Sequence, residues 1–198
     1  MVELLDGWPK SERIKAAVAL IISGIAALFI AWDFKDQMPV ADWFYHLRGT
    51  WLYPISAADL CFHEAGHWIY GILGIRFITV AGGTLMQFTF PIVCLVNFLK
   101  FQKSLAGVLF SISWIGFNFM ETCWYMADAK VQVLILTTGM TGKEGGGHDW
   151  ANMLGWLDLT DDCVGMATVV YWVGTTLFLF PIPWLIIFLW NRYVKTAD

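Results

Sequence analysis

The stretch Cys61-Phe62-His63-Glu64-Ala65-Gly66-His67 carries an HExxH pattern inside an apolar part of the chain. Residues four apart lie on the same face of a helix, so His63 and His67 can present two imidazoles to one metal ion. Glu64 then lies beside the ion, where it can take a proton from a metal-bound water. The pattern predicts a helix that carries two metal ligands and a catalytic base.

The residues before this pattern predict where its helix begins. Ser56 and Asp59 have the S-x-x-D spacing of a helix N-terminus. Asp59 lies one turn before His63 on the same stripe. We therefore expect Asp59 to accept a hydrogen bond from the outer ring N–H of His63, an arrangement that orients many metal-bound histidines.

The composition predicts an integral membrane protein. Of 198 residues, 58% are apolar and 14% charged, and the mean hydropathy is +0.61. Soluble domains average about 45–50% apolar and about 25% charged residues. The net charge of −4 argues against a nucleic-acid partner. No polar linker separates two parts of the chain, so residues 1–198 are expected to form one transmembrane domain in contact with the lipid bilayer.

Apolar stretches predict an all-α bundle of four to five transmembrane helices. Four spans are expected at residues 14–32, 56–75, 104–127 and 164–190. Residues 77–99 either span the membrane or form a re-entrant segment after the HExxH helix. If they span, the Lys and Arg residues divide equally between the two sides; if they are re-entrant, eight of the twelve lie on the cytoplasmic side. We therefore expect a re-entrant segment, broken at Gly82, Gly83 and Pro91, and a Gly-rich loop followed by an amphipathic segment at 128–162.

A polar stripe runs along the apolar stretch at 104–127 and its end. Its members are Asn118, Glu121, Tyr125 and Asp128, at steps of three, four and three residues, which place them on one helix face. An acid as deep in a span as Glu121 costs about 2.5–3.5 kcal/mol on insertion scales. The stripe is therefore predicted to face the metal site, as hydrogen-bond partners of the ligands or as alternative ligands.

The third metal ligand must come from outside the HExxH helix. Catalytic zinc sites usually have three protein ligands and one open position. His148 follows the three glycines at 145–147, which allow a loop to fold inward. We expect His148 to complete a site for one zinc ion, with Asp128, then Asp149 and Asp158, as the alternatives.

With these elements on one chain, the sequence resembles membrane-embedded zinc metalloproteases of the site-2 protease type. The resemblance rests on residues 63–67, on the Gly82-Gly83 pair and on the later His and Asp residues. The chain is more closely similar to bacterial membrane proteins that combine HExGH with a Tyr-x-x-Asp-Ala element, here 125–129, and a Gly-His-Asp-Trp element, here 147–150. The resemblance implies an inner-membrane location in a bacterium. It also implies an Asp ligand from a Leu-Asp-Gly element, whereas this chain has Leu157-Asp158-Leu159.

The predicted function is hydrolysis of peptide bonds in membrane proteins or membrane-associated peptides by an intramembrane zinc metallopeptidase. Glu64 would act as general base and then as general acid. Residues 79–84, which include Gly82 and Gly83, are expected to bind the substrate by strand addition. Gln87, which follows this segment, is also expected to contact the substrate. Two alternatives stay open: a non-catalytic membrane subunit or scaffold with a degenerate metal site, and a di-iron-type protein in which Glu121 joins Glu64 and His67. The oligomeric state is also left open.

Overall fold

The computed structural model describes residues 53–145, 147–181, 183–184 and 187. The predicted span at 14–32 lies outside these residues, as does part of the predicted 164–190 span. The described chain forms α3 (Tyr53–Gly71), α4 (Arg76–Asn97), the π-helical turn η1 (Phe98–Gln102), α5 (Leu105–Ala127), α6 (Gly142–Gly145), α7 (Asp149–Trp156), the 3-10 turn η2 (Thr160–Asp162) and α8 (Cys163–Leu179).

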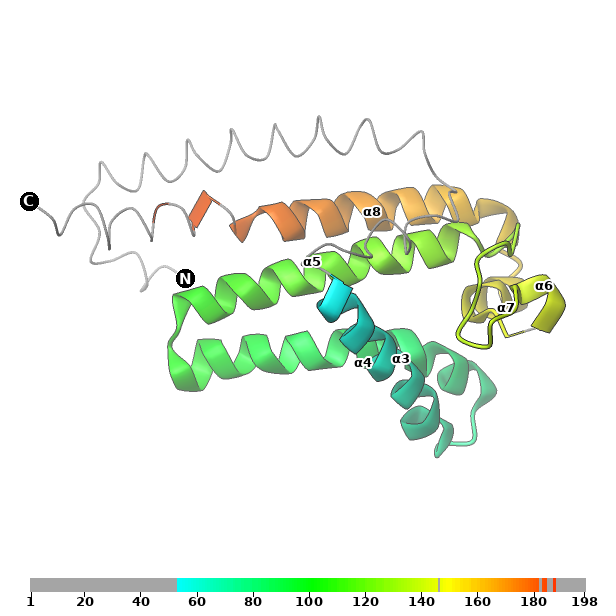
Figure 1. Ribbon diagram of the computed structural model, residues 1–198, viewed down its shortest axis with the longest axis horizontal. Helices are drawn as coiled ribbons and strands as arrows, with labels where there is room; N and C mark the ends of the chain where they lie inside the picture. Colours follow the sequence, from blue (N-terminus) through cyan, green and yellow to red (C-terminus); the bar gives the residue numbers. More distant parts are fainter. Residues whose placement is uncertain (1–52, 146, 182, 185–186, 188–198) are drawn as a thin grey trace, which may run out of the picture.

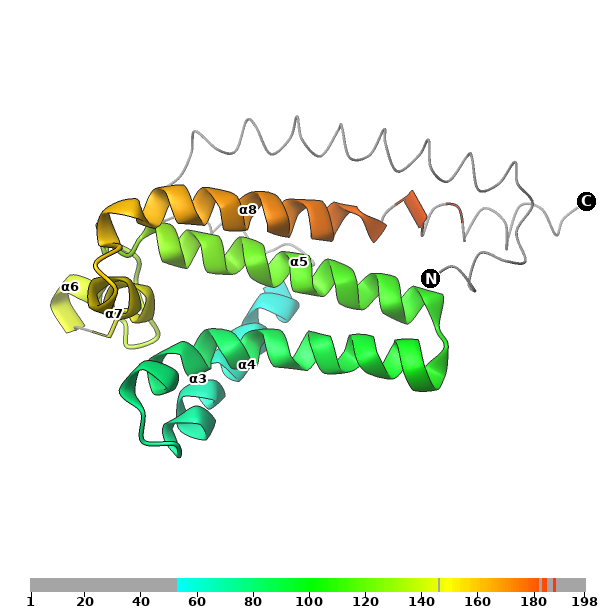
Figure 2. The same ribbon diagram turned by 180° about the vertical axis from the view of Figure 1, so that it is seen from behind.

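Three long helices form the body of the described chain. α4, α5 and α8 lie side by side with alternating direction, α5 in the middle, and α3 crosses α4 obliquely (Figures 1 and 2). The best-buried apolar residues lie mainly between α5 and α8, among them Cys123, Ala127, Ala167 and Tyr171. α6, α7 and the connections beside them gather at one end of the bundle, which we call the loop end.

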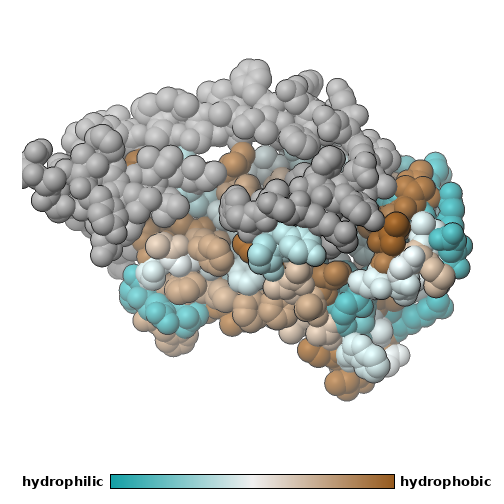
Figure 3. All heavy atoms as spheres, in the orientation of Figure 1, coloured by the Kyte–Doolittle hydropathy of each residue, from teal (hydrophilic) through white to brown (hydrophobic). Residues whose placement is uncertain are grey.

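Three helices in the described part of the chain are long and apolar enough to cross a membrane: Arg76–Gln102, Leu105–Ala127 and Thr160–Leu179. Where grey atoms leave the described residues visible in the space-filling view, apolar residues predominate along the middle and hydrophilic residues gather toward the two ends (Figure 3). The prediction of a helical membrane protein is confirmed to this extent. The HExxH helix forms, but Ser56 lies inside α3 and contacts Glu121, so it is not the predicted N-terminal cap. α3 ends at Gly71 and is not one of these three helices.

Residues 77–99 form no broken segment, so this expectation is wrong. α4 runs without interruption through Gly82, Gly83 and Pro91. Helices in a membrane accommodate such residues where neighbouring elements satisfy the freed backbone groups. The guanidinium of Arg76 lies 4.9 Å from the ring centroid of Trp156 in α7, which places the start of α4 at the loop end. The charge count that favoured a re-entrant segment therefore loses its basis, because it required Arg76 to lie on the opposite side from the loop.

The continuous helix also corrects the expected mode of substrate binding at residues 79–84. Strand addition needs backbone N–H and C=O groups that are not already paired. In α4 these groups belong to the helix. Residues 79–84 therefore have no strand edge to offer.

α3 and α4 cross where two glycines meet. A Cβ atom on Gly66 would lie 2.1 Å from the carbonyl oxygen of Gly82, and one on Gly82 would lie 2.7 Å from the carbonyl oxygen of Gly66. Small residues at such crossings let helix backbones approach closely. The glycine inside the HExxH pattern therefore sets the distance at which α4 passes under the two histidines.

We expect Gly66→Ala to destabilise the protein, because the new methyl group must push the two backbones apart. Overpacking of this kind costs typically about 1–3 kcal/mol. Thermal unfolding of the purified protein in detergent measures the effect. Gly165→Ala in α8 is the matched control, since a Cβ there meets nothing within 4 Å. Equal unfolding temperatures for the two variants would contradict the close crossing.

Candidate metal centre

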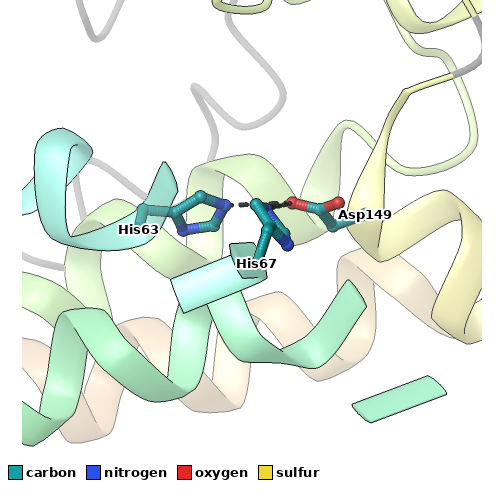
Figure 4. A group of neighbouring side chains, drawn as sticks. All are labelled: His63, His67 and Asp149. Carbon is teal, nitrogen blue, oxygen red and sulfur yellow. Dashed lines mark hydrogen bonds and ion pairs between the residues drawn. The ribbon is translucent and has the colours of Figure 1, made fainter. Parts of the chain in front are cut away.

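The two histidines of α3 and one carboxylate of α7 converge on a single point. The Nε2 atoms of His63 and His67 lie 3.0 and 3.2 Å from Oδ2 of Asp149. The three candidate ligand atoms all lie within 4.8 Å of one another (Figure 4). The i, i+4 spacing places the two imidazole rings on the same face of α3, and the first residue of α7 supplies the carboxylate.

The outer nitrogens of both rings contact α4. Nδ1 of His67 is 2.9 Å from the carbonyl oxygen of Thr79, and Nδ1 of His63 is 3.4 Å from Oε1 of Gln87. Both partners are acceptors, so each ring carries a proton on Nδ1. Nε2 of each ring faces Asp149, and it becomes a ligand atom when a metal ion takes the place of the proton between them.

Asp59 does not accept a hydrogen bond from His63 as predicted. Its two carboxylate oxygens lie 2.9 and 3.0 Å from the indole N–H of Trp114, which donates to them. The side chain of Asp59 therefore faces α5, and Gln87 takes the position beside His63 that was expected for Asp59. Spacing along α3 could not reveal that α4 lies nearer to this ring.

Asp149, and not His148, meets the two histidines, because His148 caps the N-terminus of α7. Nδ1 of His148 accepts a hydrogen bond from the backbone N–H of Ala151 at 3.2 Å. Its Nε2 lies 3.2 Å from Oδ2 of Asp128. Both ring nitrogens are thus engaged away from the His63–His67 pair, and the structure brings the third-ranked candidate to the site in place of the first.

Asp128 anchors the chain that leads to α7. Besides contacting His148, it accepts hydrogen bonds from the backbone N–H groups of Val133 and Leu134, both at 3.0 Å. Burial alone raises the pKa of Asp128, but the hydrogen bonds from His148 and these two amides outweigh it, so the pKa lies below its ordinary value. The predicted second candidate ligand is thus a support for His148.

Tyr125 holds Asp149 from α5. Its hydroxyl oxygen accepts a hydrogen bond from the backbone N–H of Asp149 at 2.9 Å and lies 3.4 Å from Oδ2 of that residue. Its ring stacks on His148, with centroids 4.3 Å apart. Burial raises the pKa of the Asp149 carboxyl. Hydrogen bonds from His63 and His67, together with the positive charges of these histidines, lower this pKa by a larger amount, so the net shift is downward. Asp149 is therefore held as a carboxylate, the form that binds metal ions.

α4 leaves room for the centre at Gly83. A Cβ atom there would lie 2.5 Å from Nε2 of His63 and 2.7 Å from Nε2 of His67. Any larger residue would displace the two ligand atoms. Gly82 contacts α3, and Gln87 contacts His63; the structure thus gives structural roles to Gly82, Gly83 and Gln87, while their contact with substrate stays a prediction.

The remaining predicted residues lie around this centre at different depths. Glu121 is hydrogen-bonded to Ser56 and Gln87, and Asn118 donates to the backbone carbonyl of Gln87 at 2.8 Å. Asp158 is exposed beyond the C-terminal end of α7. Glu64 is exposed on α3, close enough for its charge to act on His67 and Tyr125.

Sequence reasoning missed one partner of the centre, the backbone carbonyl of Thr79. No residue type marks a backbone acceptor, so no signal could have revealed it. Gln87 did carry a signal, since it is a polar amide inside an apolar stretch, but its role was taken to be substrate contact. The structure places it under His63 instead.

No family model, curated protein or solved structure matches this chain. Within residues 53–145 and 147–181, the fold and the site define a helical protein with three candidate membrane spans and a His-His-Asp group that can hold a metal ion. Two imidazoles and one carboxylate are also a donor set that catalytic zinc sites use, so the residues present fit zinc.

Proposed function

We propose that this chain is an intramembrane zinc metallopeptidase that hydrolyses peptide bonds of membrane-associated proteins or peptides. One observation carries the proposal. His63 and His67 share one carboxylate oxygen of Asp149, and Glu64 directly follows His63 in an HExxH helix. Three protein ligands of this kind leave an open position for water or substrate.

The side chains around the centre support a division of roles. Zinc, when bound, supplies a Lewis acid and a water whose pKa is lowered toward about 7. Glu64 is exposed and bound to none of the three candidate ligands, so it is free to accept a proton and return it to the leaving amine. Tyr125 and His148 hold Asp149 in place from behind.

The position of the centre along α4 supports the proposal that the peptide bond to be cleaved lies near one membrane surface. Gly83 lies about 10 Å from the start of α4 at Arg76, at about 1.5 Å of rise per residue. Asp149 comes from the loop end, outside the three candidate spans. We therefore propose that the enzyme cleaves close to the loop-end boundary of the bilayer. The proposal keeps a bacterial inner membrane as the location.

The di-iron alternative gains no support from the contacts of Glu121. Both of its oxygens accept hydrogen bonds, from Ser56 and from Gln87, and Glu121 is not part of the His63–His67–Asp149 group. A non-catalytic scaffold that keeps the metal is the remaining alternative, and the experiment below separates it from the enzyme.

Removal and return of the metal test the proposal. The purified full chain in liposomes is incubated with single-span transmembrane peptides, and mass spectrometry identifies the products. We expect one zinc per chain, cleavage that stops with 1,10-phenanthroline, and recovery when zinc is added back. Zinc binding without cleavage of any peptide would favour the scaffold, and a chain that binds no zinc would overturn the proposal.

A further inference from the structure

A chain of hydrogen-bonded side chains leads from the metal centre into α5. It begins at Nδ1 of His63, 3.4 Å from Oε1 of Gln87. It continues from Nε2 of Gln87, which donates to Oε2 of Glu121 at 3.2 Å, and it ends where the Ser56 hydroxyl donates to Oε1 of Glu121. Gln87 is only 7% exposed, so little water competes for these bonds.

The donor and acceptor in each of these hydrogen bonds follow from the groups of Gln87 and Glu121. The NH2 group of Gln87 is the only donor of its side chain, and it donates to Oε2 of Glu121, whose other oxygen contacts Ser56. Gln87 must therefore turn its NH2 group toward Glu121 and its carbonyl oxygen toward His63. The carbonyl oxygen can only accept, so the proton of His63 lies on Nδ1 and its Nε2 is left as the ligand atom.

We infer that Gln87 and Glu121 are positioning residues that set the strength of His63 as a metal ligand. The inference rests on the proposed metal site. The positive charge of a bound zinc ion favours the ionised form of Glu121. The carboxylate then draws the His63 proton outward through Gln87 and makes Nε2 the stronger donor, as carboxylate–histidine pairs do at zinc sites. This role also accounts for an acid inside a candidate span, where it needs a function to offset its cost.

The two histidines differ in how they are supported. His67 donates to a backbone carbonyl, that of Thr79, which no substitution removes. His63 depends on two side chains, from α4 and α5, which lie apart in the sequence. The packing of α4 against α5 thus acts on the metal centre through His63, and substitutions at positions 87 and 121 act on that ligand.

Exchange of the amide and the carboxylate tests the inference. Zinc affinity is measured by competition with a chromophoric chelator, and the absorption spectrum of the Co²⁺-loaded full chain reports the donor strength of the ligands. We expect Glu121→Gln, which keeps the shape and removes the charge, to lower zinc affinity by about 10- to 100-fold and to shift the Co²⁺ bands. The double variant Gln87→Glu/Glu121→Gln should recover at least wild-type affinity, because the carboxylate returns one link closer to His63.

Ser113→Ala is the matched control. Its hydroxyl donates to the backbone carbonyl of Phe178 on another face of α5, outside the chain of hydrogen bonds, and this variant should bind zinc as the wild type does. The inference is overturned if Glu121→Gln retains full affinity, or if the double variant binds as weakly as Glu121→Gln. A wild-type chain that binds no zinc would overturn the proposed function together with the inference, whereas normal wild-type binding with an unaffected Glu121→Gln overturns the inference only.

Discussion

Asp149→Ala is expected to abolish stoichiometric zinc binding, whereas His148→Ala is expected to retain the metal. Asp149 supplies the oxygen that both histidines share, so its loss should exceed the roughly 10- to 100-fold cost of losing a supporting residue. His148 acts through the cap of α7 and through Asp128, and a lost cap costs about 1 kcal/mol. Zinc per chain after purification and competition titration measure both effects.

The matched control for this pair is Asp158→Ala. Asp158 is an exposed acid beyond the C-terminal end of α7, so its removal should leave the zinc content unchanged. The zinc content of these variants also shows which residue of the loop is the third metal ligand. Equal loss of zinc in His148→Ala and Asp149→Ala would return the third position to the histidine, and loss in Asp158→Ala would support the Leu-Asp element implied by the family resemblance.

Glu64→Gln is expected to slow peptide cleavage severely while zinc stays bound. The side chain is exposed beside the centre and is not one of the three candidate ligands, so the amide preserves its size and removes only the ability to accept a proton. General-base catalysis contributes typically 10²- to 10⁴-fold, and we expect about that loss in cleavage rate. Product formation and zinc content are measured on the same preparation. Cleavage at the wild-type rate would remove Glu64 from the proposed chemistry.

The helix and the two histidines could be predicted from the sequence, because the i, i+4 spacing depends only on local geometry. The polar stripe on the apolar stretch at 104–127 could be predicted for the same reason, and the structure brings Tyr125, Asp128 and Glu121 around the centre. In each case the residues that act together lie on one helix.

The third ligand depends on the direction in which the chain enters α7. His148 and Asp149 are neighbours, and only one of them can face α3. The cap that His148 makes with Ala151 and its contact with Asp128 turn the imidazole away. The flexible glycines before His148 suggested that its side chain could reach the two histidines of α3. The direction of this side chain depends instead on Asp128, which lies 20 residues earlier in the sequence.

The course of α4 could not be predicted because the Gly82-Gly83 pair was taken as a helix break. Both glycines are needed for close approach instead, Gly82 to the backbone of Gly66 and Gly83 to the ligand atoms of the histidines. A glycine pair that breaks an isolated helix is tolerated in one that another helix covers. The count of Lys and Arg residues then favoured a re-entrant segment, with Arg76 on the side opposite the loop. In the structure Arg76 lies against α7 at the loop end.

X-ray absorption at the zinc edge of the metal-loaded chain identifies the atoms that bind the zinc ion. His63, His67 and Asp149 predict two imidazole nitrogens and one carboxylate oxygen at about 2.0–2.2 Å, with no sulfur. Asp149→Ala should lose this spectrum, and Glu64→Gln should keep it. Three imidazoles, a sulfur ligand or the absence of bound zinc would exclude the His-His-Asp zinc centre.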